Sequence, residues 1–295
     1  MEPENATLEA CLSPRNVQRA VQALAGDKAP WRYGVDHQMF AVDRDYYLLA
    51  LIEDLRHERY RPEPVRQYRR FKADGGTRMI TAMHLQDKLA QRLVAQVLTL
   101  SAERHFHPDS FGYRPGRSVA AAVGRARERV AAGLVWFVDA DIKEFFDNVP
   151  HGPLRRVLRQ YIGDRRILNL IDQWLTMGTL PHAVFKRRRG LLQGAVISPL
   201  LGNWYLNALD WRWAQRNIPF VRFADDFVLQ LRSEREARAA LADTARYLKR
   251  LGLELKPSKT RVAPASQPLN FLGKRIVNSR SLRQVAASYL SHSRK

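Results

Sequence analysis

Apolar side chains recur at helical spacing in the first third of the chain. They fall three and four residues apart within residues 1–60 and again within residues 85–100. This spacing places apolar side chains on one face of an amphipathic helix, so we expect helices in both regions. The positions that carry the pattern are Tyr47, Leu48, Leu51, Ile52 and Leu55 in the first region, and Leu85, Leu89, Leu93, Val97 and Leu100 in the second.

A hairpin pattern separates the two helical regions. Residues 61–80 carry apolar side chains on both sides of Asp74-Gly75-Gly76, a tripeptide typical of a tight turn. We therefore predict a pair of antiparallel strands here. The same hairpin is rich in cations, namely Arg66, Arg69, Arg70, Lys72 and Arg78.

The second half of the chain alternates predicted strands with predicted helices. Residues 134–138 form a nearly continuous apolar run, which favours a strand buried on both faces. In residues 221–231 the apolar side chains alternate around two central carboxylates, as at the tip of a hairpin. Ser233 and Glu236 form a capping box for a following helix that ends at Gly252. Together these elements predict an α+β fold.

Two acidic clusters contrast with the basic composition of the chain. Lys and Arg together number 49 against 29 for Asp and Glu, which gives a net charge of +20. Asp139 and Asp141 follow the predicted strand, and Asp225 and Asp226 occupy the predicted hairpin tip. Adjacent carboxylates repel one another unless a cation lies between them, and Mg²⁺ prefers such oxygen ligands. A basic protein that holds Mg²⁺ indicates phosphate chemistry on nucleic acid.

The alternative is that Asp225 and Asp226 form a solvated turn, as pairs of aspartates often do. The flanking apolar alternation and the second acidic cluster favour the metal site. Other kinds of site find little support. The single cysteine, Cys11, excludes an internal disulfide and a cysteine-based zinc site. The eight histidines show no ligand spacing.

We expect a cytoplasmic protein with no membrane partner. The apolar runs of the sequence are shorter than the roughly 18–20 residues that a spanning helix needs. The first residues are acidic and do not resemble a signal peptide.

The chain resembles reverse transcriptases, specifically the bacterial group II intron-like branch that also includes CRISPR-associated reverse transcriptases. The resemblance covers most of residues 60–273. Six motifs occur in the same order as in the family, which makes the resemblance specific. After the hairpin at residues 61–80, the motifs are FGYRPGRS (111–118), DADIKEFFDNV (139–149), QGAVISPLLGNWYLNALD (193–210), FADDFVL (223–229), LGLELKPSKTRV (251–262) and FLGKRI (271–276).

The resemblance implies a right-hand polymerase palm, an antiparallel sheet with helices packed on one face, plus fingers. It divides the chain into an N-terminal helical region (1–60), fingers (61–130), a catalytic palm (131–273) and a short basic tail (274–295). The tail leaves no room for a full thumb, so we expect a protein, a structured RNA or an oligomer to replace it.

By position, the resemblance assigns Asp141, Asp225 and Asp226 as ligands of two Mg²⁺ ions, with Mn²⁺ as a substitute. It favours Asp141 because the aromatic gate of the family lies five residues beyond the ligand, where Phe146 stands. Asp139 shares a strand face with Asp141. The alternative is that Asp139 assists in binding the metal. Lys259 resembles the family's lysine near the leaving pyrophosphate, which is a candidate general acid. The alternative is that Lys259 is a plain surface charge.

The remaining site residues are also implied by the resemblance. Phe146 is expected to exclude the 2′-hydroxyl of a ribonucleotide, although either Phe145 or Phe146 must belong to the core. The residues expected at the incoming deoxynucleotide are Lys72 and Arg78 as a triphosphate clamp, and Gln193 and Gly194 below the template–nucleotide pair. Those expected at the nucleic acid are Arg69, Arg70, Arg114, Arg117, Lys186, Arg187, Arg188, Arg189 and Phe223.

These features predict an RNA-directed DNA polymerase that uses an RNA template, a DNA or RNA primer and dNTPs. The departures from the family pattern are Phe223 in place of tyrosine, Leu192 and Gly202, and none of them is an expected metal ligand. Two alternatives stay open. One is an RNA polymerase or template-independent nucleotidyltransferase on the same palm. The other is a non-catalytic RNA-binding subunit of a defence or retroelement complex.

Overall fold

The computed structural model describes residues 6–71, 77–177 and 188–276. The chain forms two compact units that interleave along the sequence. The helical unit comprises residues 1–105 and 146–205, and the sheet unit comprises residues 106–145 and 206–295. The predicted division into N-terminal region, fingers, palm and tail follows expected roles rather than these compact units, and it stays a prediction.

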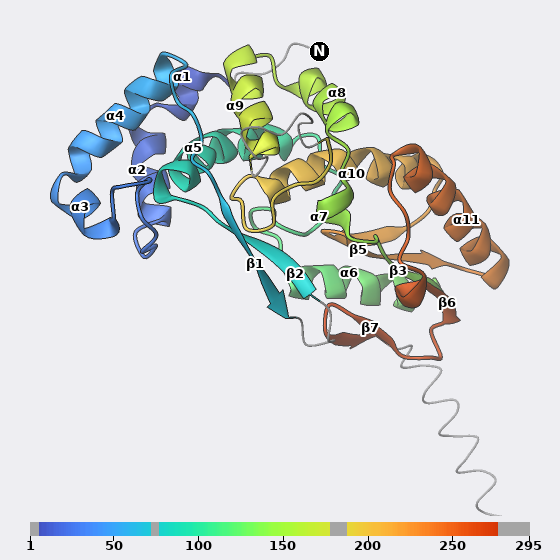
Figure 1. Ribbon diagram of the computed structural model, residues 1–295. Helices are drawn as coiled ribbons and strands as arrows, with labels where there is room; N and C mark the ends of the chain where they lie inside the picture. Colours follow the sequence, from blue (N-terminus) through green and yellow to red (C-terminus); the bar gives the residue numbers. More distant parts are fainter. Residues whose placement is uncertain (1–5, 72–76, 178–187, 277–295) are drawn as a thin grey trace, which may run out of the picture. The chain divides into compact units, whose positions relative to one another are not determined.

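Helix α5 is the centre of the helical unit, where it contacts α1, α2 and α4 (Figure 1). Leu85, Leu89 and Leu93 are buried as the spacing predicts, but Leu100 is 62% exposed because the last turn buries Leu98 instead. The helices of this unit are α1 (Leu8–Cys11), α2 (Pro14–Ala23), α3 (His37–Val42), α4 (Arg44–Arg56), α5 (Leu85–Ala102), α8 (His151–Tyr161) and α9 (Arg165–Thr176).

A buried polar network joins α5 to α9 and to the segment after α4. Asp87 of α5 is fully buried and accepts hydrogen bonds from the Tyr60 hydroxyl at 2.6 Å and from the Glu63 backbone N–H at 3.2 Å. The Trp174 indole N–H donates to the Tyr60 oxygen at 3.2 Å. Burial raises the pKa of Asp87 to about 7, so the network includes a carboxyl that is readily protonated.

The predicted hairpin between the helical regions is present. Strands β1 (Arg66–Phe71) and β2 (Thr77–Ala82) pair antiparallel, with Arg70 opposite Arg78. The predicted turn, with Lys72, lies outside the described residues. Every residue of β1 is exposed, whereas β2 buries Thr81.

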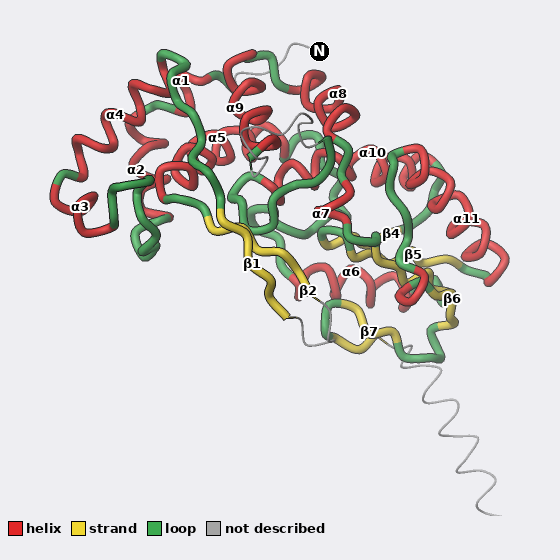
Figure 2. The backbone as a smooth tube through the Cα atoms, in the orientation of Figure 1, coloured by secondary structure: helices red, strands yellow, loops and turns green. Residues whose placement is uncertain are grey.

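The sheet unit is built on a four-stranded antiparallel sheet with strand order β4-β5-β3-β6. Its strands are coloured yellow in Figure 2. A separate two-stranded hairpin, β7–β8, follows it in the chain. The strands are β3 (Trp136–Asp141), β4 (Phe220–Phe223), β5 (Asp226–Leu231), β6 (Arg261–Pro264), β7 (Leu269–Phe271) and β8 (Lys274–Ile276).

Helices cover both faces of this sheet. On one face, α6 (Val119–Ala131) packs against Phe137 and Val228, and Gln230 donates a hydrogen bond to a carbonyl of the same helix at 2.8 Å. On the other face, Trp213 of α10 (Ser198–Gln215) lies with its ring 4.8 Å from the rings of Phe220 and Phe227. The α+β fold with an antiparallel palm sheet is confirmed, and the helical cover extends beyond the single face expected.

The capping box at the start of α11 (Glu234–Arg250) is confirmed. The Ser233 hydroxyl accepts a hydrogen bond from the Glu236 backbone N–H at 3.3 Å, and the Glu236 carboxylate accepts one from the Arg232 N–H. Gly252 has φ +72°, the left-handed conformation that glycine adopts readily after a helix. Helix α11 joins the α10 side of the sheet through an indole N–H bond from Trp213 to Thr244.

None of the helices in the described part of the chain combines the length and the apolar character needed to cross a bilayer.

Candidate active site

The sheet brings the two acidic clusters to one place. In the pairing of β3 with β5, Asp141 stands directly opposite Asp226. Directly opposite residues of antiparallel strands share a face, so these two side chains are neighbours. Asp225 lies in the two-residue turn between β4 and β5, and its carbonyl accepts a hydrogen bond from Ile142 N–H at 3.4 Å. The predicted hairpin tip and the predicted strand end therefore meet.

Crowding of carboxylates shapes the electrostatics of this site. Burial raises the pKa of Asp226 to about 7, with further contributions from the charges of Asp139, Asp141 and Asp225. Burial, followed by the charge of Asp141, also raises the pKa of Asp225. A bound cation would offset this repulsion and stabilise the ionised carboxylates.

The predicted general acid, Lys259, lies at this cluster. Its Nζ is 3.1 Å from an Asp141 carboxylate oxygen, and that hydrogen bond raises the pKa of Lys259. The short 3₁₀ helix η1 (Pro257–Lys259) presents the lysine, and the backbone N–H of Lys256 bonds to the Asp141 carbonyl at 2.8 Å. Lys259 is thus a half-exposed cation held at the carboxylates.

Asp139 has a cation of its own. It stands opposite Arg261 in the pairing of β3 with β6, and the Arg261 Nε lies 3.0 Å from its carboxylate. Burial raises the pKa of Asp139, and the hydrogen bond from Arg261 opposes that shift. Asp139 is therefore already paired with a cation, as Asp141 is with Lys259.

A fully buried ion pair supports the turn that carries Asp225. The Arg222 guanidinium bonds to both carboxylate oxygens of Asp210, at 2.7 and 2.6 Å, and both side chains have no solvent exposure. The same guanidinium donates to the Ala224 carbonyl at 2.8 Å and to the Ser110 hydroxyl at 2.8 Å. Ala224 has φ +59°, a conformation that costs a non-glycine residue energy. Arg222 therefore holds a strained turn in place from within the fold.

A second support comes from the segment 110–112. The Phe111 N–H donates to the Arg222 carbonyl at 2.8 Å. A Cβ at Gly112 would lie 2.4 Å from the Ala224 nitrogen, closer than any side chain allows. Glycine is thus required here because the turn between β4 and β5 passes directly against the backbone of the FGYRPGRS motif.

The donor set suits a hard divalent cation. Asp141, Asp225 and Asp226 offer only oxygen ligands, the kind Mg²⁺ prefers, and their mutual repulsion favours a bound cation. As the side chains stand, no group of three His, Cys, Asp or Glu residues in the described ranges is arranged to hold a metal ion. Lys259 occupies one oxygen of Asp141 instead, so metal binding requires these side chains to turn.

The expected nucleotide-binding loop lies in the helical unit and joins the β1–β2 hairpin. The Thr81 N–H donates to the Gln193 carbonyl at 2.8 Å, and the Gln193 amide donates to the Asp147 carboxylate at 3.0 Å. Gly194 has φ +99°, and a Cβ there would lie 3.0 Å from the Thr81 carbonyl. The close approach that this glycine permits is thus to the hairpin backbone.

Phe145 and Phe146 divide their roles within α7 (Phe145–Asn148). Phe145 is 2% exposed and belongs to the core, whereas Phe146 is only partly buried. The carbonyl of Phe146 accepts a hydrogen bond from Leu191 N–H at 2.6 Å, so its backbone is fixed by the loop that also carries Gln193. Phe146 is the ring with surface to offer a nucleotide.

Arg114 does not suit the predicted contact with nucleic acid. It is only 7% exposed, and it donates to the carbonyls of His107 and Ser110 at 2.7 and 2.6 Å. Its guanidinium also lies over the Phe106 ring. Arg114 therefore stabilises the loop from inside.

The other predicted contacts are exposed or lie outside the described residues. The exposed arginines with described side chains are Arg69, Arg70, Arg117, Arg188 and Arg189. Phe223 is half-buried opposite Asp226. Lys186 and Arg187 are not described, and of Arg78 only the backbone is.

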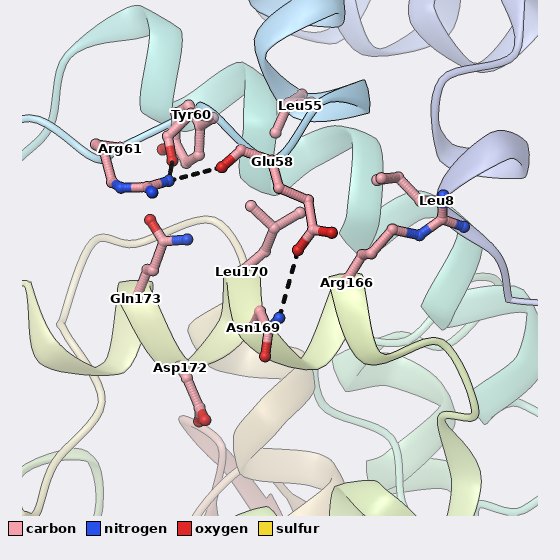
Figure 3. Close-up of a pocket in the computed structure, with 10 residues that line it drawn as sticks. All are labelled: Leu8, Leu55, Glu58, Tyr60, Arg61, Arg166, Asn169, Leu170, Asp172 and Gln173. Carbon is pink, nitrogen blue, oxygen red and sulfur yellow. Dashed lines mark hydrogen bonds between the residues drawn. The ribbon is translucent and has the colours of Figure 1, made fainter.

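A pocket of about 260 Å³ in the helical unit carries none of the predicted site residues (Figure 3). It lies between α9 and the segment after α4. Its two arginines are already engaged, Arg61 with the carbonyls of Glu58 and Tyr60 and Arg166 with Asp164. We assign it no role in the chemistry.

The sequence patterns missed three residues that hold the site. Arg222 was not distinguished from the many exposed cations, and Gly112 and Asp147 were noted only as letters of longer motifs. A signal for Arg222 does exist, because a charge inside a short apolar strand implies a buried partner.

Comparison with known proteins agrees with this geometry. Residues 71–276 match the protein family described as reverse transcriptase (RNA-dependent DNA polymerase). Protein YkfC of Escherichia coli (strain K12) is 27% identical over 303 aligned positions, which cover 87% of this chain and 78% of the relative. The group II intron-encoded protein LtrA of Lactococcus lactis subsp. cremoris is also 27% identical, over 76% of this chain and 48% of the relative. The chain thus spans about half the length of LtrA.

A solved structure shows the same fold. Telomerase from Candida albicans, determined with a fragment of telomeric RNA, matches with a TM-score of 0.58 and 13% identity. The match covers 83% of this chain and 51% of that one.

We predict that the Arg222–Asp210 pair stabilises the sheet unit. Arg222→Met leaves a buried carboxylate without a partner and should lower the free energy of unfolding by about 3–5 kcal/mol. Arg222→Met/Asp210→Leu removes both charges and should recover most of that loss. Denaturant midpoints of the three proteins measure this, and a single variant as stable as the wild type would contradict the role.

We predict that Mg²⁺ stabilises the protein more at about pH 8 than at about pH 6. The pKa of Asp226 is raised above its ordinary value, so without metal the folded state retains a proton that the unfolded chain has lost. The contribution of Asp226 to stability therefore falls as pH rises from about 4 to about 7, and a cation offsets this loss only where the carboxyl ionises.

Thermal unfolding with and without Mg²⁺ at both pH values measures the effect. Asp226→Asn, which cannot ionise, should weaken the Mg²⁺ shift and its dependence on pH. An equal Mg²⁺ shift at both pH values in the wild type would contradict the assignment.

Proposed function

Because this chain belongs to the reverse transcriptase (RNA-dependent DNA polymerase) family, we propose that it copies RNA into DNA at the carboxylates of its palm sheet. The substrates are a primer 3′-hydroxyl, an RNA template and deoxynucleoside triphosphates. The observation that carries the proposal is the placement of Asp141 opposite Asp226, with Asp225 in the adjoining turn. Two separate motifs thus supply one set of oxygen ligands.

Asp141, Asp225 and Asp226 would hold two Mg²⁺ ions, for which Mn²⁺ would substitute. Such a pair of ions, when bound, lowers the pKa of the attacking hydroxyl and neutralises charge on the leaving pyrophosphate. The protein's contribution is to fix the ligands before substrate arrives. Arg222 and Gly112 do so by holding the turn beside Asp225 in one conformation.

Lys259 is proposed to protonate the leaving pyrophosphate. Its pKa is raised by the hydrogen bond to Asp141, so the amine carries its proton at neutral pH. Metal at Asp141 would displace this ammonium from the carboxylate and leave it free to donate at the triphosphate. The lysine thus exchanges one anionic partner for another.

The helical unit is proposed to bind the nucleotide. The Gln193 side chain is oriented by Asp147 and its carbonyl by Thr81, so the loop is a fixed surface for the base pair. Phe146 would block a 2′-hydroxyl. Lys72 and Arg78 at the hairpin remain the proposed triphosphate clamp.

Nucleic acid contacts are proposed for a set of cations and one aromatic ring. A phosphate backbone is recognised by guanidinium groups without regard to sequence, in keeping with the net charge of +20. The candidates are Arg69, Arg70, Arg117, Lys186, Arg187, Arg188, Arg189 and Phe223.

One other function fits the structure less well than the proposal, and a second fits it equally. A non-catalytic RNA-binding subunit would not require Arg222 to brace a carboxylate-bearing turn. A template-independent transferase would use the same carboxylates, and only the sequence of its product distinguishes it.

We predict that primer extension depends on the aspartates. On poly(rA)/oligo(dT) with dTTP and Mg²⁺, Asp225→Asn and Asp226→Asn should each lower the rate by at least about 10²–10³-fold, because each removes a group that supports transition-state charge. Glu128→Gln, an exposed carboxylate change on α6, is the matched control and should extend like the wild type. Activity in both aspartate variants would contradict the site assignment.

We predict that Phe146 sets sugar selectivity. Phe146→Val should lower the preference for dTTP over UTP by about 10–100-fold, because a steric pocket commonly supplies discrimination of this size. The comparison of kcat/KM for the two nucleotides measures it. Phe145→Val is the matched change at the buried neighbour, and it should reduce stability while leaving the preference unchanged.

A further inference from the structure

The helical hairpin α8–α9 carries arginines that no acid of the described chain neutralises. Its carboxylates are already engaged, Asp172 with Arg155 at 2.6 Å and Asp164 with Arg166 at 2.7 Å. A further carboxylate, that of Glu9, also pairs with Arg166. The cations without an ion-pair partner among the described residues are Arg156, Arg159 and Arg165, all of them exposed.

Two of these arginines border a groove of about 470 Å³ between the helices. Arg159 lies on the α8 side, four residues and thus one helical turn after Arg155. Arg165 begins α9 on the other side. The groove therefore has cations along both of its rims.

The floor of the groove offers little apolar surface, because Leu168 is the one apolar side chain of its lining that is partly exposed. Leu158, Ile162 and Ile171 line it, yet each is at most 2% exposed because its side chain is already packed in the helical unit. A protein partner usually buries an apolar core at its interface, and a single partly exposed leucine supplies little of one. What the groove offers to a partner is positive charge.

No aromatic side chain is present among the residues that line the groove in the described chain. Single-strand binding sites that hold bases use aromatic rings as stacking platforms. Without such rings, contacts from guanidinium groups go to phosphate oxygens, which they match with two parallel hydrogen bonds.

The pocket between α9 and the segment after α4 shows the contrast. It is also lined by two arginines, but Arg61 and Arg166 already donate to carbonyl and carboxylate oxygens of the chain (Figure 3). A phosphate would have to displace those partners. Arg159 and Arg165 have no ion-pair partner among the described residues that a phosphate would have to displace.

We propose that the α8–α9 groove is a second RNA-binding surface, which holds the phosphodiester backbone of RNA outside the primer–template duplex. This inference rests on the proposed function only in taking RNA as the polyanion. Binding at this surface does not depend on the RNA sequence. It adds affinity for long RNA without taking part in the chemistry.

The test compares Arg159→Gln/Arg165→Gln with Arg235→Gln/Arg250→Gln, a matched loss of two exposed charges on α11. Each full-length protein is titrated with two probes, a primer–template whose RNA ends shortly beyond the duplex and the same one with a long single-stranded RNA extension. The groove variant should bind the extended probe about tenfold more weakly. The slope of its log affinity against log salt concentration should be shallower by about 1.4, as expected for the loss of two phosphate contacts. Its affinity for the short probe should match that of the control.

Equal affinities of both variants for the extended probe would overturn the proposal and leave an acidic protein as the occupant to test. So would equal losses on both probes, which indicate a general effect of charge. Thermal unfolding verifies that each variant is folded. Extension of the short probe by the wild type reports on the polymerase separately, so failure there would count against the proposed function and not against the groove.

Discussion

Repulsion between carboxylates at one end of a partly buried sheet is the constraint on which the site depends. Asp226 faces Asp141 across two strands and has Asp225 as its chain neighbour, and burial deprives all three of full solvation. Left alone, such a group relaxes by taking up a proton or by moving apart. Lys259 and Arg261 each neutralise one carboxylate from the same side of the sheet, at Asp141 and Asp139. A cation from solution would neutralise the remaining negative charge.

Holding such a cluster together requires rigidity in the backbone that carries it. The turn between β4 and β5 has a left-handed alanine, and Arg222 satisfies its carbonyl from a position with no solvent exposure. Burying that arginine is tolerable only because Asp210 accepts two hydrogen bonds from it and Ser110 a third. Residues of three elements, Asp210 of α10, Arg222 of β4 and Ser110 of the preceding loop, thus meet beside one turn, so side chains outside the motif at residues 223–229 hold it in place.

The elements of the fold were predictable where the pattern is local. The capping box at Ser233 and the β1–β2 hairpin follow from spacing alone, whereas the meeting of the two acidic clusters was expected from the chemistry of carboxylates and from the resemblance. Side-chain faces were harder. Phe223, Asp225 and Phe227 alternate in the sequence, but the two-residue turn shifts the alternation, so Asp226 shares a face with Phe223 and Phe227 lies on the other.

Burial of charged residues was beyond the reach of the pattern. Arg114 and Arg117 stand three apart in one motif and look alike, yet one is 7% exposed and serves the loop while the other faces solvent. Arg222 likewise reads as one more cation in a chain with 49 of them. Their partners, backbone carbonyls and the distant Asp210, become visible only when the fold brings them together.

The most direct test of the account is to locate the metal. Crystals of the protein with an RNA template, a DNA primer, a non-hydrolysable deoxynucleotide and Mn²⁺ would be measured for anomalous scattering. The account predicts two peaks about 3.5–4 Å apart, bounded by Asp141, Asp225 and Asp226, with Asp139 still paired to Arg261. Manganese elsewhere, or a nucleotide bound with no peak at these carboxylates, would contradict it.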